Sequence, residues 1–177
     1  MNKIITVFGS SIPKAGDDEY ATGYELGKKL ALNKFDVCTG GYKGIMEAVS
    51  KGAVDNGSRA IGVTLDYIKT VANKYITEEI KCSNLFERIN KLIELGSAYI
   101  VLQGGTGTLL ELSAVWEFMN KGLISPKPII AHSNVWKEIG TTMDLQIKKE
   151  NRITGLVSYA DSVEDIIIQL DLKLKGV

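Results

Sequence analysis

The sequence predicts an α/β fold, a single doubly wound parallel sheet with helices on both faces, and two observations support this. Short β-branched runs alternate along the chain with longer amphipathic stretches, which is the pattern of repeated βαβ units. The short runs are almost continuously apolar, as expected of strands that helices cover on both faces. Strands are predicted at residues 4–8, 35–38, 60–65, 98–102 and 128–131.

Apolar residues at helical spacing mark the faces that predicted helices turn to the core. The segment 66–82 is less regular and leaves room for a loop and a short extra strand. No repeat, low-complexity tract or linker divides the chain, so residues 1–177 are predicted to form one domain. The four apolar faces are Ala21, Tyr24, Gly27 and Ala31; Leu85, Ile89, Leu92 and Ile93; Leu112, Val115, Trp116 and Met119; and Val163, Ile166, Ile167, Leu170 and Leu174.

Charge and composition exclude several classes of partner. Lys and Arg number 21, as do Asp and Glu, so no overall field attracts nucleic acid or an anionic membrane. The apolar runs are too short to cross a bilayer, and residues 1–4 lack a signal-peptide pattern, so a cytoplasmic location is expected. Cys38 and Cys82 show neither zinc-ligand spacing nor a disulfide framework, which predicts reduced, strand-associated thiols and no metal site.

Three loops follow predicted strands at the edge of the sheet where ligands of this fold bind. Ser10 and Ser11 offer hydroxyls after the first strand, and residues 39–47 carry glycines that let a ligand approach the backbone. Residues 103–108, Gln-Gly-Gly-Thr-Gly-Thr, follow an apolar strand and open a helix predicted to begin at Leu109. Backbone amides and the positive helix end there favour an anion such as phosphate.

Other nucleotide sites fit these loops poorly. No Gly-Lys-Ser/Thr ending follows Gly107, which disfavours a Walker A triphosphate site, and the first strand is not followed by the GxGxxG of NAD-binding proteins. Glu111 alone reads as the end of a capping box that starts at Thr108. Arg88 alone reads as a solvated side chain, and His132 as a structural histidine outside the mechanism.

The motifs at residues 39–48 and 104–111, with Arg88 between them, resemble those of the LOG family. Proteins of that family were long labelled lysine decarboxylases, but characterised members are phosphoribohydrolases that cut the N-glycosidic bond of nucleoside 5′-monophosphates, cytokinin nucleotides included. The resemblance implies Arg88 and Glu111 as catalytic residues acting at the ribose. It further implies a phosphate and substrate site made by Ser10, Ser11, Gly40, Gly41, Met46, Gly104, Gly105, Thr106, Gly107 and Thr108.

The resemblance also implies a Rossmann-like nucleotide-binding domain, a homodimer, a small-molecule nucleotide as partner, and no cofactor or metal. The homodimer is further favoured by Trp116, Phe118 and Met119, which lie on successive faces of one helix. A pyridoxal-phosphate-dependent decarboxylase is disfavoured, because such enzymes have much larger chains and a Schiff-base lysine. The chain departs from the family pattern at four positions: Gln103, Ile89, Tyr42 and Lys43.

A different class of function remains open beside hydrolysis. Related folds carry molybdenum cofactor or sense nucleotides on similar glycine loops, so a non-catalytic carrier or sensor is the alternative. The presence of both Arg88 and Glu111 favours an enzyme that cleaves an AMP-like or cytokinin-like nucleotide. The sequence does not name the base.

Overall fold

The order of strands in the sheet is β4-β3-β2-β1-β5-β6-β7, and every neighbouring pair is parallel. The computed structural model describes residues 2–67 and 70–175, and these form one seven-stranded sheet. The predicted α/β doubly wound fold is confirmed. The strands are β1 (Ile4–Phe8), β2 (Asp36–Thr39), β3 (Ala60–Leu65), β4 (Glu78–Cys82), β5 (Ala98–Val101), β6 (Ile129–Ala131) and β7 (Val157–Tyr159).

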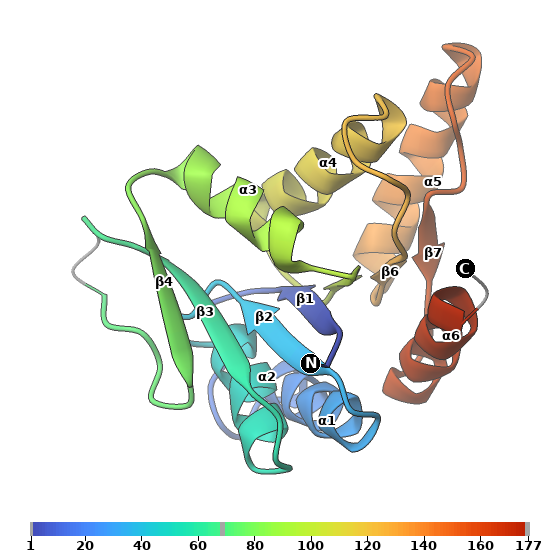
Figure 1. The fold of residues 1–177 in the computed structure, drawn as a ribbon. Helices are drawn as coiled ribbons and strands as arrows, with labels where there is room; N and C mark the ends of the chain where they lie inside the picture. Colours follow the sequence, from blue (N-terminus) through green and yellow to red (C-terminus); the bar gives the residue numbers. More distant parts are fainter. Residues whose placement is uncertain (1, 68–69, 176–177) are drawn as a thin grey trace.

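Helices cover both faces of the sheet (Figure 1). One face carries α1 (Asp18–Leu32), α2 (Ile45–Val54) and α6 (Val163–Lys175), and the other carries α3 (Leu85–Leu95), α4 (Thr106–Asn120) and α5 (Asn134–Lys149). Each face has its own apolar core. Neighbouring residues of β1 alternate between the cores, since Val7 belongs to the cluster under α1 and α2, and Phe8 to the cluster under α3 and α4.

The buried face of α1 differs from the predicted one. Ala21 is exposed and Tyr24 is half-buried, while Gly23, Leu26 and Leu30 are buried together with the predicted Gly27 and Ala31. The helix α2 approaches this face closely, because a Cβ on Gly27 would collide with the Val49 carbonyl. Glycines therefore form part of the contact surface, and the predicted face omitted Gly23 together with the buried Leu26 and Leu30.

Other differences concern short or marginal elements. The extra strand foreseen in residues 66–82 is β4, whereas β7 and α5 were not predicted. A strand of three residues, such as β7, is too short to show a periodic pattern. Leu85 was placed on the buried face of α3 but is 38% exposed at the start of that helix. Cys38 and Cys82 are free, buried thiols on strands, as predicted. Among the described residues, no helix is long and apolar enough to span a membrane.

Candidate active site

The candidate site lies where β1 and β5 are neighbours in the sheet. The chain places β2, β3 and β4 on one side of β1 and then returns to place β5 on its other side, so strand order reverses here. Two backbone hydrogen bonds join the loops at this point. Ser10 N donates to the Gln103 carbonyl at 2.9 Å, and Ile45 N donates to the Ser10 carbonyl at 2.8 Å. The three loops predicted to carry the site therefore meet.

The glycine-rich turn after β5 enters its helix one turn earlier than predicted. The helix begins at Thr106, with Gly105 as its extended N-cap, and not at Leu109. Leu109 N donates to the Gly105 carbonyl at 3.0 Å, which places the intervening residues within the first helical turn. A glycine is tolerated in that turn because first-turn amides require no acceptor within the helix.

The start of α4 is open to a ligand. Residues 105–107 are exposed, and a Cβ built on Gly105 or Gly107 would meet no heavy atom within 4 Å. Gly104 differs, because a Cβ there would collide with the side chain of Thr108, which is itself buried. Exposed backbone at the positive end of a helix is the kind of surface that can accept an anion.

The two other loops contribute backbone more than side chains. Ser11 is exposed, whereas Ser10 is half-buried and its hydroxyl accepts a hydrogen bond from Ile12 N at 3.1 Å. Gly40 and Gly41 are buried, as is Met46 at the start of α2. A Cβ on Gly40 would collide with the Arg88 guanidinium and would lie 2.8 Å from the Met46 sulfur. Glycine at position 40 thus makes room for Arg88.

Arg88 and Glu111 form a buried ion pair beside these loops. Arg88 is on α3 and 8% exposed, so it is not the solvated side chain that its position alone suggests. Its Nη1 lies 3.5 Å from Glu111 Oε1, its Nε donates to the Val63 carbonyl at 2.7 Å, and its Nη2 donates to the Gly40 carbonyl at 3.1 Å. Backbone acceptors thereby hold the guanidinium against the carboxylate.

The capping-box explanation of Glu111 is wrong. Thr108 is the third residue of α4 and not its N-cap, and the N-cap residue Gly105 makes no side-chain capping bond. Glu111 therefore lies in the second turn, with its side chain 13% exposed. Burial raises the pKa of the Glu111 carboxyl from 4.5 to about 7, and the nearby Arg88 only partly opposes this. A carboxyl with that pKa exchanges protons near neutral pH, which suits an acid or base in catalysis.

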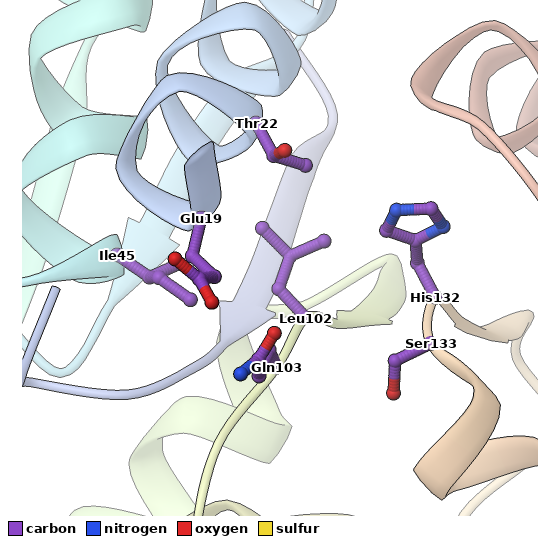
Figure 2. Close-up of a pocket in the computed structure, with 7 residues that line it drawn as sticks. All are labelled: Glu19, Thr22, Ile45, Leu102, Gln103, His132 and Ser133. Atoms are coloured by element: carbon purple, nitrogen blue, oxygen red, sulfur yellow. The ribbon is translucent and has the colours of Figure 1, made fainter. Parts of the chain in front are cut away.

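Hollows beside the glycine-rich turn leave space for a ligand. One of about 400 Å³ is bordered by Ser10, Asp17, Glu19, Gln103 and Gly104, among others. A smaller one of about 70 Å³ shares Glu19 and Gln103 with it and is drawn in Figure 2. Figure 2 shows Glu19 and Gln103 facing this hollow from one side.

The far side of the smaller hollow is formed by His132 and Ser133. His132 Nδ1 donates to the Ala160 carbonyl at 2.9 Å, and Ser133 caps α5 by accepting from Trp136 N. Both side chains thus have structural partners, which agrees with the structural interpretation of His132.

Sequence reasoning missed one residue that shapes the site. Asn73 is buried in the loop between β3 and β4, and its Nδ2 donates to the Gly41 carbonyl at 3.1 Å and to the Tyr42 carbonyl at 2.9 Å. An asparagine in an irregular segment usually serves its own turn, so its sequence gives no signal of this distant contact.

A protein-family model, described as the SLOG cluster4 family, matches residues 2–167. The chain belongs to the SLOG cluster4 family. Curated relatives bear LOG names, and the predicted LOG resemblance is confirmed. One relative is the cytokinin riboside 5′-monophosphate phosphoribohydrolase of Rhodococcoides fascians. It is 28% identical over 136 residues, which cover 75% of this chain and 69% of the relative.

A second relative and a solved structure extend the comparison. The pyrimidine/purine nucleotide 5′-monophosphate nucleosidase of Escherichia coli (strain K12) is 30% identical over 120 residues, which are 63% of this chain. They are 26% of that relative, so this SLOG cluster4 chain spans about a quarter of its length. The Moco carrier protein from Chlamydomonas reinhardtii has a TM-score of 0.80 at 22% identity, with 100% of both chains covered. That likeness concerns the fold alone.

Proposed function

We propose that the chain hydrolyses the N-glycosidic bond of a nucleoside 5′-monophosphate, AMP-like or cytokinin-like, to the free base and ribose 5-phosphate. The observation that carries this proposal is the buried Arg88–Glu111 pair, in which Glu111 lies within two helical turns of the open start of α4. Relatives named as hydrolases of such nucleotides support it. The phosphate and the scissile bond of one small nucleotide would then occupy neighbouring parts of the site.

The roles follow from the charges that develop during the reaction. The bond between the anomeric carbon and the base nitrogen breaks, its electron pair leaves with the base, and positive charge develops on the ribose. Glu111 would stabilise this charge and take a proton from the attacking water, for which a pKa of about 7 is suitable, and the departing base nitrogen would gain a proton from Glu111 or from solvent. Arg88 would orient Glu111, while the amides at residues 105–108 hold the phosphate so that its binding energy positions the sugar.

The experiment that tests the function is a chromatographic screen. The protein is incubated with a panel of nucleoside 5′-monophosphates, and the products are analysed for free base and ribose 5-phosphate. We expect at least one monophosphate to be cleaved, and the corresponding nucleosides, which lack the phosphate, to be cleaved far more slowly. Tight binding of a monophosphate without cleavage of any would contradict the proposal and favour the carrier or sensor alternative.

Substituting Gly105 by Val is expected to weaken phosphate binding without unfolding the protein. The position has a negative φ of −100° and open space around it, so the fold accepts a side chain. The added methyl groups would occupy the space in which an anion approaches the helix amides, and we expect the Kd for AMP to rise roughly tenfold or more.

Calorimetric titration with AMP and thermal unfolding measure the two effects separately. The control is Ser125→Val, which places the same side chain on the loop between α4 and β6, at the other end of α4 from Gly105. Gly122→Val would not serve as a control, because Gly122 has a positive φ of 67° and a valine there would be strained. Equal affinity of wild type and Gly105→Val would show that the phosphate binds elsewhere.

We also propose a homodimer, on the basis of the resemblance to the LOG family. The further reason drawn from α4 needs correction, because Trp116 and Met119 are buried in the core of the same chain and Phe118 packs against that core. Two features of α4 remain open: a groove of about 510 Å³ that it forms with α5, and the exposed side chain of Leu110. We expect light scattering at micromolar concentration to give twice the chain mass of 19.3 kDa. A monomer mass would contradict the proposal.

A further inference from the structure

Hydrogen bonds hold both the hydroxyl of the Tyr42 side chain and the backbone around Tyr42 in place. The Tyr42 hydroxyl accepts a hydrogen bond from Leu65 N at 2.9 Å, at the end of β3. At the backbone, the Tyr42 carbonyl accepts from Asn73 Nδ2 at 2.9 Å, and the preceding Gly41 carbonyl accepts from Asn73 N at 2.8 Å. The ring is therefore a fixed surface between the loop after β2 and the loop after β3.

The Arg88 guanidinium lies over this ring. Its Cζ is 5.6 Å from the ring centroid of Tyr42, within the range of a cation–π contact. The hydrogen bonds to the Val63 and Gly40 carbonyls restrain the edge of the guanidinium, but an edge contact alone leaves the plane free to tilt. A flat aromatic surface restrains that tilt, and the tilt sets the direction of the N–H groups that reach Glu111.

We propose that Tyr42 is a positioning residue, whose ring fixes the plane of the Arg88 guanidinium so that Arg88 holds Glu111 and presents its remaining N–H groups to the substrate. Three of the five guanidinium N–H groups have partners among the described residues, at Val63, Gly40 and Glu111, which leaves two for a ligand. This role rests on the proposed function. It concerns a residue at which the chain departs from the LOG pattern, where small residues are commoner.

The experiment compares four variants with wild type. Tyr42→Leu removes the ring face, and Tyr42→Phe keeps the face but loses the hydroxyl. Asn73→Ala releases the backbone of Tyr42 and serves if Tyr42→Leu does not fold. Tyr24→Leu is the matched control, because Tyr24 also has a hydrogen-bonded hydroxyl and a cation over its ring, Lys51 Nζ at 4.5 Å, but lies in the α1–α2 contact.

The first measurement is the ¹⁵N order parameter of the Arg88 Nε–H group by NMR, which needs no catalytic activity. In wild type we expect the value of a rigid group, about 0.85, and in Tyr42→Leu a fall below about 0.6. Tyr24→Leu should keep the wild-type value, Tyr42→Phe should stay close to it because the ring face and the backbone hydrogen bonds remain, and Asn73→Ala should fall in between. The second measurement is kcat for a cleaved monophosphate, which we expect to fall roughly tenfold in Tyr42→Leu and less than about twofold in Tyr42→Phe.

The outcomes separate this proposal from the proposed function. An Arg88 group as rigid in Tyr42→Leu and Asn73→Ala as in wild type would overturn the positioning role, whatever the activity. A loss of rigidity with rescue by Tyr42→Phe would support it even if wild type cleaves no monophosphate, a result that overturns only the hydrolase function. If Tyr24→Leu lowered the order parameter of Arg88 as much as Tyr42→Leu does, the effect would reflect general destabilisation, and the proposal would be overturned.

Discussion

We expect the Glu111→Gln substitution to lower kcat on a cleaved nucleoside monophosphate by on the order of a hundredfold or more, with little change in nucleotide affinity. Glutamine has nearly the same shape but cannot carry the negative charge that stabilises a cationic ribose, nor take a proton from water. We expect the change to cost the fold little, because Glu111 does not cap α4 and the amide oxygen of a glutamine can still accept a hydrogen bond from Arg88. Stopped-time chromatography of released base gives the rate, and calorimetry the affinity.

Glu117→Gln is the matched control for this prediction. Glu117 lies on the same helix and also pairs with an arginine, Arg152 at 2.8 Å, but its side chain is 42% exposed. We expect this variant to keep wild-type turnover, since an exposed pair contributes little. A Glu111→Gln variant as active as wild type would remove Glu111 from the mechanism.

We expect the Arg88→Leu substitution to destabilise the fold by an amount that grows with pH. The change leaves the Val63 and Gly40 carbonyls without their donors, which costs roughly 1 to 3 kcal/mol at any pH. In the unfolded chain Glu111 titrates near 4.5, and in the fold its pKa is about 7, so its burial opposes folding increasingly as pH rises between these values. In wild type, the charge of Arg88 reduces the free-energy cost of burying the ionised Glu111 carboxylate. Arg88→Leu removes that charge, so the cost is no longer reduced.

We therefore expect the loss of unfolding free energy to be smallest at about pH 5, where the folded carboxyl is protonated, and to reach roughly 3 to 5 kcal/mol at about pH 8.5. Urea unfolding at both pH values measures it. In the Glu111→Gln protein, Arg88→Leu should lower the free energy of unfolding by the same amount at both pH values. A pH-independent loss in the wild-type background would show that the pair is not electrostatically coupled.

The alternation of apolar runs was sufficient to predict the fold class, because strands covered by helices on both faces are almost continuously apolar. It was also sufficient to place the three loops that join at Ser10, Ile45 and Gln103, since parallel strands end at one edge. Only the resemblance to the LOG family predicted that Arg88 and Glu111 act in the same site. The sequence around each residue gave no sign that its side chain is buried. The structure brings them to 3.5 Å.

The remaining errors have different physical causes. The predicted face of α1 omitted Gly23, whose lack of a side chain lets α2 approach closely. The start of α4 was misplaced because Gly105 adopts an extended N-cap that local propensity does not reveal. Asn73 was missed because its partners lie more than 30 residues earlier, at Gly41 and Tyr42.

The adjacency of β1 and β5 also governs how the protein is made. Ile5 of β1 is paired with Ala98 of β5. The strand β1 therefore emerges from the ribosome long before β5, and one of its edges is unpaired until β5 has been made. Closing so long a loop slows folding, and an apolar strand with an open edge can pair with another chain meanwhile. We therefore expect fragments that end before Ala98 to aggregate, and a split of the chain into complementing halves to work best after β5, at the exposed turn between α4 and β6.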